Sequence, residues 1–153
     1  MRTLLLSLCF SAIISFGLHG QSIDLEYIRS NYEHASTDKT LCKKMMEGME
    51  ANNKNPVFLA YLGGLQSIWA NHVWSPMAKY KTFNKGKNNI EEAVEMAPDN
   101  IEIRVIRWSV QHNAPRFLGY HQEIENDKQF INDNKHVVQS ESLKQLLHKL
   151  EIE

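Results

Sequence analysis

Cysteine is nearly absent from this sequence. Its 153 residues include two, Cys9 and Cys42, and Cys9 lies in an apolar N-terminal run that we expect to be removed. Cys42 would then be alone, which excludes a disulfide within the remaining chain. Its neighbours Leu41 and Met45 favour burial of the thiol. We therefore expect the domain to be held together by its hydrophobic core.

Neither sign of charge is in excess. Without Arg2, 16 basic residues remain against 18 acidic ones. Proteins that bind nucleic acids usually carry a strongly basic surface, and this composition does not provide one. We expect no nucleic-acid partner.

Long apolar runs are also lacking, with one exception at the N-terminus. Arg2 is followed by an apolar run from Leu4 to Leu18 and then by polar residues after Gly20. This is the pattern of a secretory signal peptide, and a run of about 15 residues is short for a membrane-spanning helix, which needs about 20. The sequence predicts a signal peptide over residues 1–20 and one domain over 21–153. The mature protein would be periplasmic or extracellular and would have no stable membrane span, although a retained leader is an alternative.

No segment shows the strict alternation of a half-buried strand, whereas helical spacing recurs throughout. The clearest case is Leu143, Leu146, Leu147 and Leu150. The pattern predicts an all-α fold of antiparallel helical hairpins, a TPR-like array of about seven helices. The expected helices span residues 22–35, 38–51, 57–74, 76–97, 100–112, 117–132 and 140–150.

Proline is rare, and all four prolines fall at or between the ends of predicted helices: Pro56, Pro76, Pro98 and Pro115. Proline suits the first turn of a helix and interrupts a helix interior. The helix after Pro56 is apolar on nearly every side, which is typical of a buried helix. Its Gly63-Gly64 pair lowers helix propensity, so we expect another helix to pack closely against it.

Two short segments resemble a degenerate tetratricopeptide repeat, Ala60-Tyr61-Leu62-Gly63-Gly64 and Ala93-Val94-Glu95-Met96-Ala97-Pro98-Asp99-Asn100. In that repeat, Leu-Gly in the first helix lets the two helices approach, and a proline closes the unit. The resemblance covers roughly residues 56–107. It implies stacked helical hairpins.

The stretch from Tyr61 to Tyr120 also resembles a group of small uncharacterised secreted proteins of Gram-negative bacteria. The shared features are Pro76-x-x-Lys79, Lys85-Gly86, Pro98-Asp99-Asn100-x-Glu102-x-Arg104 and Asn113-x-Pro115-x-Phe117-Leu118-Gly119-Tyr120. This resemblance implies export and a helical fold.

Motifs for catalysis and metal binding are missing. No two histidines have the i, i+4 spacing that places both on one helical face around zinc, and no Gly-x-Ser-x-Gly elbow is present. We predict no catalytic residues, no metal ligands and no cofactor. A metal-dependent or small-molecule-processing enzyme using His72, His112 and His121 remains an alternative.

The predicted fifth helix carries a polar row, Arg104 and Arg107, beside Trp108. Arg and Trp are common anchors in binding surfaces. The alternative is structural, with the arginines paired to Glu91, Glu92 or Glu95 of the preceding helix. The residues that we expect to bind a partner, an unidentified protein or peptide, are Trp69, Trp74, Arg104, Arg107 and Trp108.

The predicted fourth helix has lysines early and glutamates late, an order that opposes the helix dipole. The lysines are Lys79, Lys81, Lys85 and Lys87, and the glutamates are Glu91, Glu92 and Glu95. This helix face is either simply solvated or a basic patch for an acidic partner or lipid headgroups. The apolar stripe facing the core is expected to comprise Met77, Tyr80, Phe83, Ile90, Val94 and Ala97.

These observations favour a non-catalytic protein-interaction module of the cell envelope, because TPR-like hairpins form surfaces that take up peptides or proteins. The other two hypotheses are the histidine-dependent enzyme and a structural or self-associating envelope component.

Overall fold

The computed structural model describes residues 23–49 and 54–150. This part of the chain contains seven α-helices and no strand, so the predicted all-α class is confirmed. The helices are α1 (Leu25–Asn31), α2 (Lys39–Met49), α3 (Pro56–Trp69), α4 (Pro76–Met96), α5 (Ile101–Asn113), α6 (Ile124–Asn134) and α7 (Glu141–Lys149). Short 3₁₀ turns are η1 (His34–Ser36), η3 (Ala70–His72), η4 (Arg116–Leu118) and η5 (Lys135–Val137).

Side-chain caps fix where several helices begin. The Oδ1 atom of Asn55 accepts hydrogen bonds from the backbone N–H groups of Val57 and Phe58, and Pro56 occupies the first helical position of α3. Asn100 caps α5 and Ser140 caps α7 in the same way. Each cap satisfies backbone donors that would otherwise lack a partner at the helix start.

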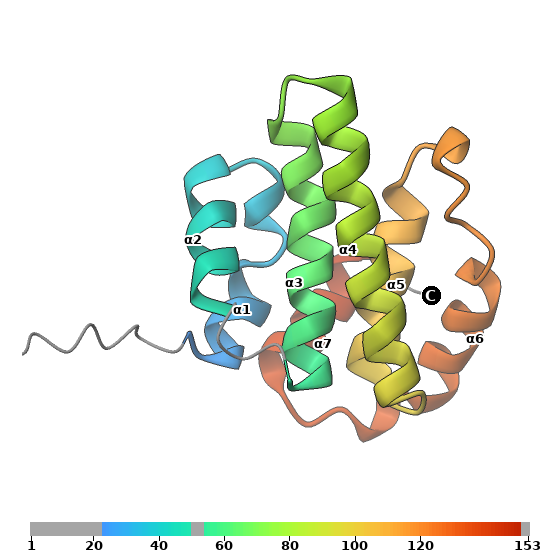
Figure 1. The fold of residues 1–153 in the computed structure, drawn as a ribbon. Coiled ribbons are helices and arrows are strands. Elements are labelled where there is room, and N and C mark those ends of the chain that lie inside the picture. Colours follow the sequence, from blue (N-terminus) through green and yellow to red (C-terminus); the bar gives the residue numbers. More distant parts are fainter. Residues whose placement is uncertain (1–22, 50–53, 151–153) are drawn as a thin grey trace, which may run out of the picture.

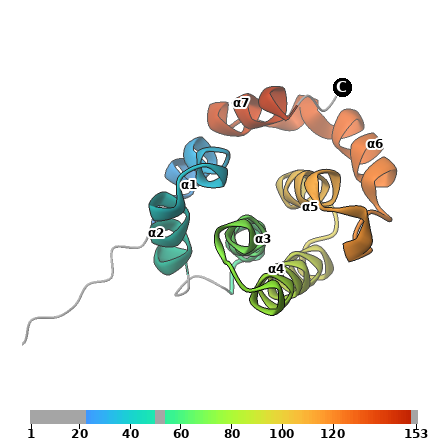
Figure 2. The same ribbon diagram turned by 90° about the horizontal axis from the view of Figure 1, so that it is seen from above.

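The helices surround a core formed around α3 and α5. Seen from above, α3 and α5 lie inside, and α2, α1, α7, α6 and α4 lie around them (Figure 2). The first helix, α1, contacts the last, α7, so the two ends of the described chain meet. Among the described residues, no helix is long and apolar enough to cross a membrane.

Helices α3 and α4 pack closely because glycines face each other. A Cβ atom added to Gly63 would lie 2.5 Å from the carbonyl oxygen of Gly86 and 2.8 Å from Cγ1 of Ile90. On the adjacent side, Gly64 leaves room for the hydroxyl of Tyr32. The close approach predicted from Gly63-Gly64 is therefore present, with Gly86 as the partner on α4.

Three predicted helix spans are wrong. The helix predicted over 22–35 ends at Asn31 and is followed by a turn and η1. The helix predicted over 117–132 begins only at Ile124, because Gly119 adopts a left-handed conformation with φ of 64° and ends η4. The helix predicted to run to Trp74 ends at Trp69 and is followed by η3 and an extended segment. The predicted signal peptide, residues 1–20, lies outside the described residues.

Candidate functional site

The polar row on α5 is held by a carboxylate of α6. Asp127 is completely buried and accepts hydrogen bonds from Nε and Nη2 of Arg107, at 2.6 and 2.7 Å. Arg104 donates a third, from Nη1, at 2.8 Å. A buried carboxylate with two guanidinium partners is compensated both in charge and in hydrogen bonding. The two arginines therefore join α5 to α6.

Helix α4 is attached to the same cluster through Glu91. Its carboxylate accepts a hydrogen bond from Nη1 of Arg107 at 3.1 Å and another from the hydroxyl of Tyr120 at 2.6 Å. Burial, with the nearby Glu91 charge, raises the pKa of Tyr120 far above its ordinary value, so the phenol is a hydrogen-bond donor. The pairing of Arg107 with Glu91 is one of those expected from the sequence.

Glu102 forms a second buried cluster at the start of α5. It accepts two hydrogen bonds from the guanidinium of Arg29 on α1, both 2.6 Å, and one from the hydroxyl of Tyr61 on α3, at 2.8 Å. Arg29 also pairs with Glu26 in its own helix. The Glu102 carboxylate thus connects α1, α3 and α5.

The tryptophans expected to bind a partner lie in three different environments. Trp108 is buried, stacks on His112 with ring centroids 4.6 Å apart, and has no hydrogen-bond partner for Nε1 among the described residues. Trp69 is half-buried beneath Lys39, whose Nζ lies 5.3 Å from the ring centroid. Trp74 is 96% exposed. The structure does not bring the three rings together.

Besides Trp74, three further apolar side chains on the same segments are exposed, and the sequence pattern did not predict their exposure. Met77 is 62% exposed, Tyr80 is 54% exposed, and Phe117 in η4 is 86% exposed. The prediction that Met77 and Tyr80 face the core is wrong. Beyond the end of α3, η3 packs against α4. Met77 and Tyr80 lie on the part of the first turns of α4 that remains exposed.

The exposed residues lie at one end of the molecule. Figure 1 shows the connection between α3 and α4 and the η4 segment at the same, upper end of the helices. Tyr120, two residues after η4, packs edge-on against Phe83 of α4, with 6.1 Å between the ring centroids.

Basic residues, but no acidic ones, lie close to these exposed residues in the sequence. Residues 51–90 and 103–122 contain no Asp or Glu. Lys79, Lys81, Lys85 and Arg116 are exposed and form no ion pair with any residue that the structure describes. We define the aromatic–basic end as Trp74, Met77, Lys79, Tyr80, Lys81, Arg116 and Phe117.

Groups with catalytic potential are dispersed or buried in the described part of the chain. No set of three or more His, Cys, Asp or Glu side chains there is arranged to hold a metal ion. Among the three histidines of the enzyme hypothesis, Nε2 of His72 lies 3.3 Å from the carbonyl oxygen of Ala35, and His112 stacks on Trp108. Burial raises the pKa of the Cys42 thiol to about 12, which keeps it protonated.

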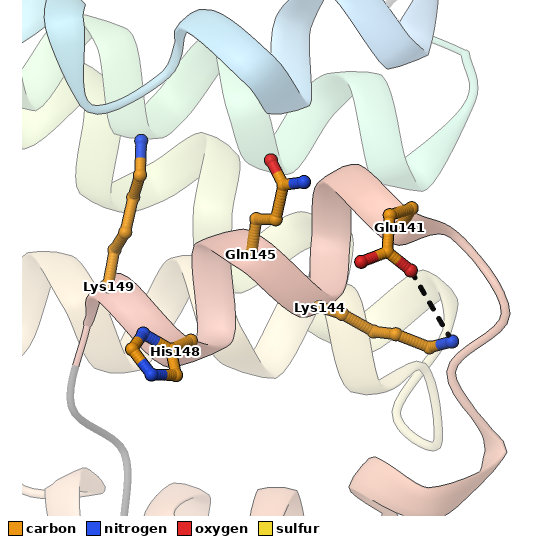
Figure 3. Close-up of a pocket in the computed structure, with 5 residues that line it drawn as sticks. All are labelled: Glu141, Lys144, Gln145, His148 and Lys149. Carbon is orange, nitrogen blue, oxygen red and sulfur yellow. Dashed lines mark ion pairs between the residues drawn. The ribbon is translucent and has the colours of Figure 1, made fainter.

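A shallow hollow runs along α7, lined by Glu141, Lys144, Gln145, His148 and Lys149 (Figure 3). All five side chains come from one helix and are exposed, and Glu141 pairs with Lys144 at 3.7 Å. None of these polar side chains is buried, so the hollow lacks the convergent, desolvated groups of a typical ligand site.

Comparison of the chain with protein-family models, with curated proteins and with solved structures finds no match.

Proposed function

We propose that this protein is a non-catalytic interaction module of the cell envelope, which docks on another envelope component through its aromatic–basic end. The observation that carries the proposal is the exposure of Trp74 and Phe117 on two segments at one end of the fold, which also carry lysines and an arginine that pair with no acid in the described part of the chain. Large apolar groups gathered on a surface mark interaction sites. Export by the signal peptide of residues 1–20 and a periplasmic or extracellular location are parts of this proposal.

Binding is favoured over catalysis by what the buried polar groups do. Arg107 bonds to Asp127 and Tyr61 bonds to Glu102, and each pair ties helices together. Catalytic groups usually sit in a cleft with perturbed pKa values. Here Tyr61, Tyr120 and Arg107, whose pKa values are raised, are inside the packed helices, so their role is best explained as structural.

Among the five residues expected to bind a partner, Trp74 is the one we assign to the contact surface. Arg107 and Trp108 are buried, and the guanidinium of Arg104 donates hydrogen bonds to Asp127 and to the carbonyl oxygen of Pro98. We assign these three, with Trp69, to the scaffold. The protein or peptide partner expected from the sequence is then replaced by a broader class, any envelope component that accepts exposed aromatic and cationic groups.

A TPR-like hairpin is also part of the proposal, for α3 and α4 alone. The close approach of Gly63 and Gly86 supports it, since small residues at this contact are what the repeat uses. The contact between α1 and α7 makes the described helices a closed group, whereas an open array contacts only its sequential neighbours. We therefore place the proposed docking surface at the end of the helices.

Co-sedimentation with an envelope fraction tests this function. The purified protein is incubated with washed bacterial envelopes, and the bound share is compared between the wild type and a Trp74→Ser/Phe117→Ser variant. We expect the variant to lose at least nine-tenths of the binding. The matched control is Tyr27→Ser/Val137→Ser, which removes two exposed apolar side chains elsewhere and should bind as the wild type does. Equal binding by all three proteins, or none by the wild type, contradicts the proposal.

A further inference from the structure

We infer that the aromatic–basic end docks on an anionic phospholipid surface, so that the protein is a peripheral, reversibly bound membrane protein. This inference rests on the proposed function and names the partner of the same surface.

The arrangement of the exposed side chains suits contact with a plane. Trp74 precedes α4, Met77 and Tyr80 lie on its first turns, and Phe117 lies on η4, all at the same end of the helices (Figure 1). Residues at one end can reach a flat surface together. Trp74 and Phe117 are 96% and 86% exposed, so they project from the fold rather than line a groove.

The chemistry of these side chains fits the boundary between headgroups and acyl chains. Trp and Tyr have an apolar ring and one polar atom, and they concentrate at membrane interfaces for that reason. Phe and Met supply apolar area that can enter the acyl boundary. Lys79 and Lys81 are long enough to keep their ammonium groups at the phosphates while the rings insert.

The charge distribution orients the molecule relative to an anionic surface. The aromatic–basic end has no acidic residue in its two segments, whereas Glu92, Glu95 and Asp99 are exposed near the other end of α4. An anionic surface attracts the first end and repels the second. The order of charges along α4, which opposes the helix dipole, has a reason under this arrangement, because it places cations at the docking end.

Lipid is favoured over a protein partner by the abundance of lysine. The buried centres of protein interfaces are depleted in Lys and enriched in Arg. The aromatic–basic end has Lys79, Lys81 and, next to them, Lys85 against one exposed arginine, Arg116. Anionic membranes attract Lys and Arg alike, each through charge near the surface.

Sedimentation with sucrose-loaded vesicles tests the inference. The vesicles contain either phosphatidylcholine alone or phosphatidylcholine with one quarter phosphatidylglycerol, and the protein is purified in soluble form. Each basic residue near such a surface strengthens binding about five-fold, so Lys79→Gln/Lys81→Gln should weaken binding to the anionic vesicles about thirty-fold. Lys135→Gln/Lys144→Gln removes the same charge from η5 and α7 and should change binding less than three-fold. Raising the salt from about 0.1 M to about 1 M, which shortens the screening length from about 10 Å to about 3 Å, should release the protein.

The outcomes separate this inference from the proposed function. Equal binding to neutral and anionic vesicles, or an equal loss in the two lysine variants, overturns the inference. If envelopes retain the protein through Trp74 and Phe117, vesicles do not, and protease treatment of the envelopes abolishes retention, the partner is a protein and only the inference falls. If neither envelopes nor vesicles bind, both proposals fall.

Discussion

Substitution of Gly63 by alanine tests the packing of α3 against α4. The added Cβ would lie 2.5 Å from the carbonyl oxygen of Gly86 and 3.0 Å from the backbone nitrogen of Ile90. Backbone atoms cannot rotate out of the way as a flexible side chain can. The two helices must therefore separate locally, which loosens the contact that positions the start of α4.

The expected magnitude combines two opposing effects. Alanine favours the helix by about 1 kcal/mol relative to glycine. Overpacking a filled interior destabilises by about 1–3 kcal/mol, and because the obstructing atoms here are backbone, the upper part of that range, about 2–3 kcal/mol, applies. We expect a net loss of about 1–2 kcal/mol in the free energy of unfolding, measured by urea denaturation followed by circular dichroism at 222 nm.

Gly48→Ala serves as the control because Gly48 lies within α2 and gains the same helix propensity. The three atoms nearest to its added Cβ all belong to the side chain of Ile23, the closest being Cβ at 3.1 Å. We expect this variant to match or exceed the wild type in stability. If Gly63→Ala is as stable as Gly48→Ala, the two helices do not approach as closely as described, and the reasoning is refuted.

Three further predictions concern buried or constrained residues. Asp127→Asn removes the fully buried carboxylate that compensates Arg107, which keeps only its longer pairs to the more exposed Glu91 and Glu123, and should reduce the free energy of unfolding by about 3–5 kcal/mol in urea denaturation. A loss below about 1 kcal/mol would contradict the buried cluster. Because burial raises the pKa of Cys42 from 9.0 to about 12, the thiol should resist iodoacetamide at pH 8 until the protein is unfolded, and rapid labelling of the native protein would contradict its burial. The thiol of the unfolded chain ionises at a lower pH than the buried thiol. The contribution of Cys42 to stability should therefore fall as the pH rises from 9 towards 12. Gly119→Ala should reduce the free energy of unfolding by about 1 kcal/mol or more, because a φ of 64° is strained for a residue with a Cβ atom, even though nothing lies within 4 Å of the added Cβ. An unchanged unfolding midpoint would contradict that backbone conformation.

Features with local causes were predictable from the sequence. The helix starts near Pro56, Asn100 and Ser140 follow from proline and cap chemistry, which acts within one turn. The need for a close neighbour at Gly63 also followed, because glycine inside a buried helix requires a packing reason. Only the identity of that neighbour, Gly86, depended on the fold.

Features that depend on distant pairing were not predictable. Nothing in the local sequence of α6 distinguishes Asp127 from a solvated acid, yet it is the buried partner of Arg107, 20 residues away. The exposed positions of Met77 and Tyr80 depend on what packs against the first turns of α4, where η3 is the neighbour, and helical periodicity does not encode that. The candidate surface therefore emerged only when the lengths and contacts of the helices were known.

The most direct test of the docking account is quenching of tryptophan fluorescence by anionic vesicles whose phosphatidylcholine carries bromine on the acyl chains. Trp74 is 96% exposed, while Trp108 is buried and Trp69 is half-buried. We predict strong quenching of the wild type, most of which disappears in a Trp74→Phe variant that still sediments with the vesicles. Quenching that is absent, or that is unchanged by Trp74→Phe, would contradict the claim that this end of the protein enters the membrane interface.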